Sequence, residues 1–183
     1  MKIKEIGRKE LDKALPLVWD VFCKFEAVDY PENGRQAFRD AIHDEEYLDS
    51  LKAYGAFEGK ELLGIIATSK NGSHVALFFV DGNHHGKGIG RQLWNRVLAD
   101  NNCEVIDVHS SVFAVPIYEK LDFVRTDGVK EENGIRYVPM EYRTEIKENC
   151  PCKKSNCIRH GHCNECRAHH EKSGRERPCE KTE

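Results

Sequence analysis

The most informative stretch of this sequence is Val80-Asp81-Gly82-Asn83-His84-His85-Gly86-Lys87-Gly88-Ile89-Gly90-Arg91. The apolar, β-prone run of residues 74–80 leads into it and predicts a buried strand. Beyond it, Ile89, Leu93 and Val97 recur at helical spacing, which predicts a helix over 89–100. The stretch therefore joins a strand to a helix through a glycine turn.

Glycines at positions 86, 88 and 90 allow the backbone of this turn to approach a ligand closely. N–H groups at a helix start, with the positive end of the helix dipole, bind phosphate groups. The P-loop pattern is Gly-x-x-x-x-Gly-Lys-Ser/Thr, and the turn does not match it because no Gly-Lys-Ser/Thr follows the first glycine at that spacing. It does not match the dinucleotide fingerprint either, because the third glycine comes too early. The turn thus predicts a phosphorylated cofactor of another kind, and a tight turn without a ligand is the alternative.

One motif within the stretch, His85-Gly86-Lys87-Gly88-Ile89-Gly90, resembles the acetyl-CoA loop of the GNAT-type N-acetyltransferases. The family pattern is Gln/Arg-x-x-Gly-x-Gly/Ala, and His85 stands in place of the usual Gln or Arg. The backbone amides do most of the phosphate binding in such a loop. The exchange therefore changes one side-chain contact and leaves the loop itself intact.

A second motif, residues 111–123, is similar to the family pattern Asn-x-x-Ala-x-x-Phe-Tyr-Glu-x-x-Gly-Phe. Ser111 replaces the usual Asn, and Asp122 replaces the usual Gly; Asp tolerates the left-handed backbone that Gly often supplies. The resemblance covers residues 1–145, and residues 146–183 form a separate tail. It implies an α+β fold with a mixed, mostly antiparallel central sheet flanked by helices.

The resemblance implies that the cofactor is acetyl-CoA. In the family, the pantetheine arm inserts where the fourth and fifth strands separate, and the thioester carbonyl meets a backbone N–H near the end of the fourth strand. The residues that the resemblance assigns to the cofactor are Phe79, Val80, His85, Gly86, Lys87, Gly88, Ile89, Gly90, Arg91 and Ser111.

The implied reaction is direct attack of a primary amine on acetyl-CoA, the amine belonging to a small molecule or to a lysine or N-terminus of a protein. Acetyl transfer needs a neutral amine, a polarised carbonyl and a proton for the leaving thiolate. By its motif position Tyr118 is the general acid, and simple aromatic packing is the alternative. Glu26 is the preferred general base, while Asp29, Tyr30 and His109 remain alternatives to it.

Apolar periodicity and turn signals divide the rest of residues 1–145 into alternating strands and helices. Strands are expected over 2–6, 53–58, 61–69, 74–80 and 104–109, with a closing hairpin near 123–127 and 135–142. Helices are expected over 9–26, 34–43, 45–51, 89–100 and 114–120. Glycine-containing turns are expected around Gly59, at Asn71-Gly72 and over residues 131–134.

The length of 183 residues and the hydrophobic content of 39% suit one compact domain with an appendage. No apolar run approaches the ~20 residues needed to cross a membrane. Residues 1–6 alternate like a first strand and lack the apolar core of a signal peptide. These features predict a cytoplasmic protein that does not contact membranes.

Charge is unevenly distributed along the chain. Residues 147–183 carry nine Lys and Arg against six Asp and Glu, although the whole chain has a formal charge of −3. The first 146 residues are therefore acidic, which argues against nucleic acid as a partner of the main domain. The positive excess of the tail is too small to decide whether it binds nucleic acid or another acidic partner.

Six of the eight cysteines fall in the last 34 residues: Cys150, Cys152, Cys157, Cys163, Cys166 and Cys179. Four histidines lie among them, and apolar residues are almost absent, so metal or disulfides would have to stabilise any fold there. In a cytoplasmic enzyme, metal ligation by thiolates is favoured over disulfides. These cysteines predict a structural zinc site, with an iron–sulfur cluster as the rival and a reduced segment that binds nothing as the third interpretation.

Two classes of function follow from the sequence. The first is an acetyl-CoA-dependent N-acetyltransferase, favoured by the intact glycine loop and by Tyr118. The second is a non-catalytic acetyl-CoA-binding protein whose metal-bound tail contacts partners or senses metal or oxidants. His85, Ser111 and Asp122, which depart from the family motifs, are the features that favour the second class.

Overall fold

The structure is a computed structural model that describes residues 1–144 and eight positions of the tail: 152, 154, 157, 166, 169, 170, 173 and 174. The elements follow one another as β1 (Lys2–Ile6), α1 (Arg8–Phe25), η1 (Ala27–Asp29), α2 (Glu32–Ala41), α3 (Glu45–Asp49), β2 (Leu51–Glu58), β3 (Glu61–Ser69), β4 (His74–Val80), η2 (Gly82–His84), α4 (Ile89–Ala99), β5 (Val105–Ser110), α5 (Val115–Glu119), β6 (Val124–Arg125), β7 (Lys130–Glu132) and β8 (Ile135–Arg143). The predicted mixed α+β fold is confirmed.

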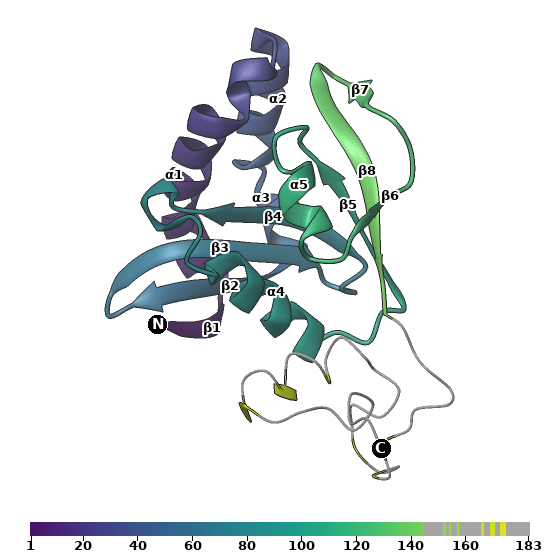
Figure 1. Ribbon diagram of the computed structural model, residues 1–183. Coiled ribbons are helices and arrows are strands. Elements are labelled where there is room, and N and C mark those ends of the chain that lie inside the picture. The colour runs from purple at the N-terminus through teal and green to yellow at the C-terminus, as the bar shows by residue number, and fades with distance from the viewer. Residues whose placement is uncertain are drawn as a thin grey trace.

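A single twisted sheet runs through the molecule in the strand order β1-β2-β3-β4-β5-β8-β6, and β7 pairs with one end of β8 (Figure 1). Every recorded strand pair is antiparallel except β4 with β5, which is parallel. A parallel pair needs a crossover connection, and α4 supplies it between these two strands. The mostly antiparallel sheet predicted from the sequence is therefore present.

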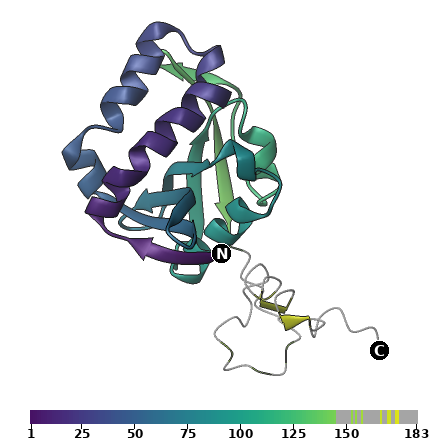
Figure 2. The same ribbon diagram turned by 90° about the vertical axis from the view of Figure 1, so that its left-hand side faces the viewer.

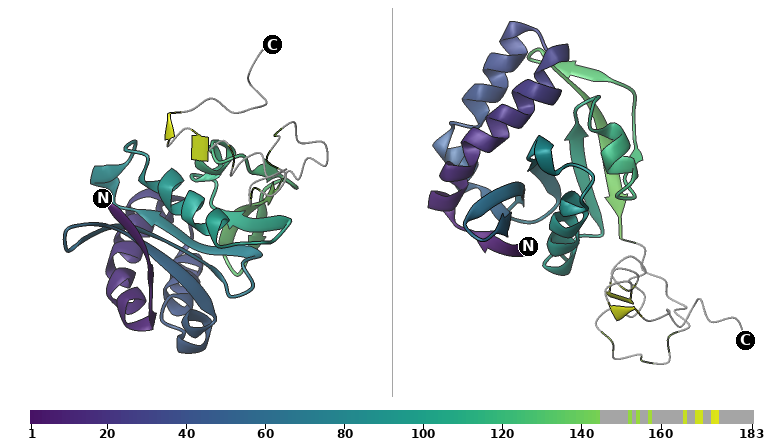
Figure 3. Two further views of the ribbon diagram at one scale, coloured as in Figure 1. Left: turned by 90° about the horizontal axis from the view of Figure 1, so that it is seen from below. Right: turned by 60° about the vertical axis from the view of Figure 1, so that its left-hand side comes forward.

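Helices cover both faces of the sheet. In Figure 2, α1 and α2 lie together on one side, and Figure 3 shows α4 and α5 on the other. The α1 side buries Leu11, Val18 and Phe22 against strand residues such as Leu77. The α4 side buries a second cluster that includes Leu93, Trp94 and Tyr118. Two hydrophobic layers thus hold the central strands rigidly in place.

A β-bulge in β4 changes which side chains face each layer. Ala67 of β3 pairs with Leu77 and Thr68 pairs with Val75, so Ala76 is an extra residue on β4. Because strand side chains alternate between faces, one extra residue moves the following side chains to the other face. Val75 accordingly packs on the α4 side, whereas Leu77 packs on the α1 side. A bulge also bends its strand, here beside the parallel partner β5.

The strands β4 and β5 pair only where they begin. Their recorded register is His74 with Asp107 and Val75 with Val108. Beyond this point β4 continues to Val80 and β5 to Ser110 without further recorded pairing among the described residues. The centre of the sheet therefore opens into a V between two strands that remain anchored on their other edges by β3 and β8.

The observed elements agree closely with those predicted, and the hairpin at the end of the domain differs most. The predicted turn at Asn133-Gly134 is present, with φ of 52° and 79°, and it joins β7 to β8. The strand over residues 130–132 was not expected, because all three of its residues are charged and exposed. Helix α2 begins at Glu32 rather than at 34, since Pro31 serves as its N-cap.

The helices of the described residues include none with the combination of length and apolar character that a membrane span requires.

Candidate active site

The glycine turn between β4 and α4 has a backbone that favours glycine. Gly86 and Gly88 both have a φ of 75°, and no atom lies within 4 Å of where a Cβ of either residue would stand. Free space is thus available, and the left-handed backbone is what selects glycine at these positions. Residues 85–88 are exposed, so the turn is accessible to a ligand.

Helix α4 begins directly after this turn, with Gly88 as its N-cap. The first N–H groups of a helix have no partners within it, and they point out of the helix start with the positive end of the dipole. Lys87 adds an exposed cation, while the Arg91 guanidinium donates to the carbonyl of Lys120. This arrangement suits an anionic ligand such as a diphosphate.

His85 connects the turn to its flanking elements. Its Nε2 donates to the Val80 carbonyl at 2.8 Å, and its ring centroid lies 4.9 Å from that of Phe25 in α1. Phe25 also stacks on Phe113, which follows β5, at 5.5 Å between centroids. The aromatic groups of three separate segments thus meet at the wide end of the V between β4 and β5.

The polar backbone groups of Val80 face the opening of the V. The N–H of Asp81 donates to the Leu63 carbonyl of β3 at 2.9 Å. Because successive residues of a strand direct their polar groups to opposite edges, the N–H of Val80 faces the β5 edge. It therefore has the orientation needed to donate a hydrogen bond to a carbonyl oxygen bound beside Phe79.

A cavity of about 400 Å³ lies where β4 and β5 separate. Its lining comes from α1, α2, α3, β4, β5, α5, the β7–β8 hairpin and the connections between them. Of the predicted site residues, Glu26, Phe79, Ser111 and Tyr118 line it. The structure thus brings together residues from four segments that are distant in the sequence, whereas residues 85–91 form the glycine turn beyond the end of β4.

Glu26, the C-cap of α1, is half-buried, and its surroundings desolvate the carboxyl group. Burial raises the pKa of this group from 4.5 to about 7, and a hydrogen bond with the Ser111 side chain opposes part of the rise. The Ser111 hydroxyl also accepts a hydrogen bond from the Ala114 N–H at 3.2 Å, at the turn before α5. Near neutral pH this carboxyl group is therefore able to accept or release a proton.

Tyr118 of α5 is 6% exposed and packs against Phe78 and Phe123, with ring centroids 5.9 Å and 5.1 Å away. Burial raises the pKa of its phenol well above the usual range, and the negative charge of Glu26 raises it further. The hydroxyl group therefore stays protonated at every physiological pH. The cavity thus combines a proton acceptor near neutral pKa with a permanent O–H donor.

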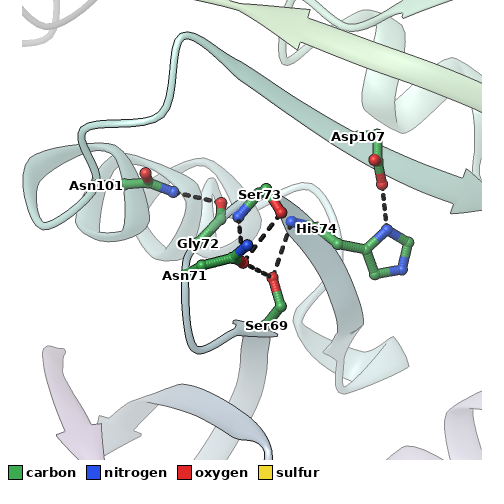
Figure 4. Close-up of polar contacts among 7 residues, drawn as sticks. All are labelled: Ser69, Asn71, Gly72, Ser73, His74, Asn101 and Asp107. Carbon is green, nitrogen blue, oxygen red and sulfur yellow. Dashed lines mark hydrogen bonds and ion pairs between the residues drawn. The ribbon is translucent and has the colours of Figure 1, made fainter.

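The sheet floor of the cavity carries a cluster of imidazole and phenol side chains. The turn at Asn71-Gly72 starts β4 with His74, whose Nδ1 hydrogen-bonds Asp107 across the parallel pair (Figure 4). His109 lies edge-on to His74 at 5.5 Å and stacks on Tyr137 of β8 at 4.1 Å between centroids. Burial, and then the charge of His74, lowers the pKa of His109, so its imidazole is neutral near pH 7.

The alternatives to Glu26 as proton acceptor occupy different places. His109 and Tyr30 both line the cavity. The Tyr30 hydroxyl donates to the Arg136 carbonyl at 2.9 Å, which fixes this side chain in the wall. Asp29 ends η1, and its side chain lies outside what the structure describes.

Sequence reasoning missed most lining residues of the cavity, and His74, Glu132 and Tyr137 are the titratable ones among them that lie on strands. Each belongs to a strand whose sequence carries no recognisable site motif. Strand alternation was the available signal, since His109 and Tyr137 are at positions that face away from the α4 core. Their meeting depends on the register of β5 with β8, which the sequence did not specify.

The predicted metal ligands of the tail are only partly described. Cys150, Cys163 and Cys179 lie outside the described residues, whereas Cys152, Cys157 and Cys166 are described and half-buried. Within the described part of the chain, no three His, Cys, Asp or Glu side chains gather as possible ligands of one metal ion. The metal site therefore stays a prediction about residues that the structure largely leaves out.

A family model described as "Acetyltransferase (GNAT) domain" matches residues 26–144, which is more than half of the chain. This range contains the glycine turn and the segment around Tyr118. A comparison with curated proteins gives no match.

Solved structures with the same fold are numerous. A GCN5-related N-acetyltransferase from Rhodopseudomonas palustris has a TM-score of 0.67 and 15% identity, over 78% of this chain and 94% of that one. The PaiA N-acetyltransferase of Thermoplasma acidophilum, solved with coenzyme A, has a TM-score of 0.60 and 16% identity, over 78% and 98%. Tetrahymena GCN5 has a TM-score of 0.54 and 17% identity, over 78% and 96%. At these low sequence identities, the similarity to the solved structures shows a shared fold and says nothing about the substrate.

Proposed function

This chain belongs to the GNAT acetyltransferase family, and from that membership we propose that it transfers the acetyl group of acetyl-CoA to a primary amine by direct attack. Family membership supports acetyl transfer in general. A structural relative named as an N-acetyltransferase was solved with coenzyme A, which supports the same cofactor here. The observation that carries the proposal is the cavity beside the glycine turn, where Glu26 and Tyr118 both line the walls.

The cofactor is proposed to bind along the glycine turn and into the V between β4 and β5. The amides at the start of α4 hold its diphosphate, and Lys87 contributes charge from the exposed surface of the turn. The pantetheine arm then passes His85 toward the cavity. The full set of residues proposed to contact the cofactor is Phe79, Val80, His85, Gly86, Lys87, Gly88, Ile89, Gly90, Arg91 and Ser111.

The thioester carbonyl is polarised by the Val80 N–H, which faces the opening. A tetrahedral intermediate places negative charge on the carbonyl oxygen, and a fixed N–H donor stabilises that charge more than the ground state. Removal of one such donor in other enzymes costs about 10²–10³ in kcat. Val80 acts through its backbone, so this contribution is independent of its side chain.

Glu26 is proposed as the general base. The amine nitrogen forms the new C–N bond and passes its proton to the Glu26 carboxylate. A pKa of about 7 suits this role, since a base titrating near the working pH is both ionised and able to hold a proton. The same carboxylate attracts a cationic amine toward the cavity, and the ammonium group releases one proton to solvent before the neutral amine attacks.

Tyr118 is proposed as the general acid. As the C–S bond breaks, the electron pair goes to sulfur and the phenol donates its O–H proton to the thiolate. A thiol is ordinarily more acidic than a phenol, so the phenolate formed is short-lived. The phenolate recovers a proton from Glu26, which has just been protonated. Glu26 lies near enough for its ionised form to raise the pKa of Tyr118. The cycle thus returns both side chains to their starting states.

The test is the release of coenzyme A from acetyl-CoA in the presence of a panel of amines, with calorimetry of coenzyme A binding alongside. Turnover that requires both Glu26 and Tyr118 supports the proposal. Binding of coenzyme A without turnover on any small amine, polyamine or peptide would instead favour a non-catalytic acetyl-CoA-binding protein.

For the tail, the proposal is a structural zinc site that draws its ligands from Cys150, Cys152, Cys157, Cys163, Cys166 and Cys179. Clustered thiolates with short spacings are typical zinc ligands, and an iron–sulfur cluster is the rival that uses the same residues. Elemental analysis of protein purified without added metal distinguishes zinc, iron and neither.

A further inference from the structure

Two backbones touch beside the lining residues Ala37 and Asn133 of the cavity. Gly34 in the first turn of α2 lies against Gly134 in the β7–β8 turn, so closely that a Cβ on Gly34 would stand 2.2 Å from the Gly134 carbonyl oxygen. Figure 1 shows α2 and the β7–β8 hairpin side by side at the same end of the molecule. Glycine at position 34 permits this approach, because any side chain there would have to displace the hairpin.

A hydrogen bond joins the same two parts of the chain. The Tyr30 hydroxyl, in the connection between α1 and α2, donates to the Arg136 carbonyl of β8 at 2.9 Å. The connection and the hairpin are thus joined at two points on the same side of the cavity. These two contacts bring the α1–α2 connection and the hairpin together, which narrows the space available to an extended polypeptide.

The lining of the cavity is aromatic and carries few charges. Eight aromatic side chains line it, Tyr30 and Tyr137 among them. Its carboxyl groups are Glu26, which is half-buried, and Glu132, which is exposed at the hairpin. No Lys or Arg is present among the described lining residues.

This lining selects among amines by the cost of removing polar groups from water. One buried carboxylate pairs with one ammonium group, and aromatic faces attract the same cation. A second ammonium group would lose hydration without a second buried carboxylate to pair with, which is unfavourable. An apolar body of ring size, in contrast, gains free energy by covering the aromatic side chains.

We propose that the acceptor is a small monoamine with an apolar, ring-sized body, such as an arylalkylamine, and that polyamines, aminoglycosides and polypeptide lysines are poor acceptors. The inference rests on the proposed acetyl transfer and narrows it to one class of substrate. The amine meets Glu26 and the thioester, and the apolar body lies against Phe38 and Tyr137 near the contact between α2 and the hairpin.

The first experiment compares kcat/KM for 2-phenylethylamine, spermidine, kanamycin and a lysine peptide with a free N-terminus, using full-length protein and coenzyme A release. We expect 2-phenylethylamine to exceed each of the others by about tenfold or more, in line with the 10–200-fold discrimination of apolar pockets. A peptide or spermidine as the best acceptor would overturn this inference and leave acetyl transfer standing. Absence of turnover on every amine, with coenzyme A bound, would overturn both.

The second experiment fills the cavity from α2. Ala37 lines the cavity, so Ala37→Trp should lower the ratio of kcat/KM for 2-phenylethylamine to that for propylamine about tenfold, because the larger body loses its space. Ala99→Trp, at the exposed end of α4, is the matched control and should leave the ratio unchanged. Circular dichroism and coenzyme A affinity report whether both variants fold. An unchanged ratio in folded Ala37→Trp would contradict the inference.

Discussion

The Ser111 hydroxyl, directly after β5, hydrogen-bonds the carboxyl group of Glu26 at the end of α1. The two residues are far apart in the sequence, and they meet where β5 diverges from β4. This contact holds a desolvated carboxyl group beside the proposed path of the thioester. It also keeps that group from becoming fully neutral, since the hydrogen bond from Ser111 lowers its pKa.

Glu26→Gln should remove the general base. We expect kcat/KM to fall by about 10²–10⁴, the usual contribution of general acid–base catalysis. The wild-type rate should rise through a pH of about 7 as Glu26 ionises, and this step should be missing from the variant. A pH–rate profile measures both effects. Asp20→Asn, an exposed carboxylate on the same helix, is the control and should keep the wild-type profile.

The same substitution should change the pH dependence of stability. The folded-state pKa of Glu26, about 7, lies above its ordinary value of 4.5, so its stabilising effect is complete below pH 4.5 and is lost as pH rises through 7. As pH rises from 5 to 8, the unfolding free energy of wild type should therefore fall relative to that of Glu26→Gln, by roughly 1–3 kcal/mol. Urea denaturation at both pH values measures it. If wild type and Glu26→Gln differed in unfolding free energy by the same amount at both pH values, the carboxyl group of Glu26 would not be desolvated in the folded protein.

Tyr118→Phe should lower kcat by about 10²–10⁴ with little change in amine KM, because the proton donor is lost and the ring remains. The stacking on Phe78 and Phe123 does not involve the hydroxyl, so the fold should persist. Tyr54→Phe is the control. The Tyr54 hydroxyl donates a hydrogen bond to the Asp100 carboxylate at 2.8 Å, and neither residue lines the cavity. It should cost about 1 kcal/mol of stability and leave kcat unchanged.

Gly88→Ala should weaken coenzyme A binding. A side chain in the left-handed backbone at φ 75° costs roughly 1–2 kcal/mol, and relaxation of the turn would move the amides at the start of α4. Calorimetry should show an increase in Kd of about tenfold. Gly128→Ala is a suitable control, because space is also open there and no positive φ is required. Equal coenzyme A affinities of Gly88→Ala and Gly128→Ala would mean that the glycine turn does not take part in cofactor binding.

The sequence predicted the local parts of the site well. The turn at residues 85–90 and the segment around Tyr118 are short, and their glycines, apolar spacing and motif order are visible in the chain itself. The strands 2–6, 61–69 and 74–80 were predicted at their observed bounds for the same reason. Glu26 was identified only as one of several candidates, since its burial depends on how α1 packs over β4.

The parts that sequence reasoning missed depend on long-range pairing. His74 reaches Asp107 and His109 only because β4 and β5 are parallel neighbours, and Tyr137 joins them through the register of β8. The contact between Gly34 and Gly134 likewise depends on the position of a hairpin whose strand β7 is too polar to recognise. Alternation and propensity do not encode such relationships between distant segments.

The central claim, that backbone amides of residues 86–91 bind the diphosphate of acetyl-CoA, is tested most directly by a crystal structure of the protein with coenzyme A. We predict diphosphate oxygens within about 3.2 Å of the nitrogens at the start of α4, with the pantetheine arm between β4 and β5. A diphosphate bound away from this turn would contradict the account.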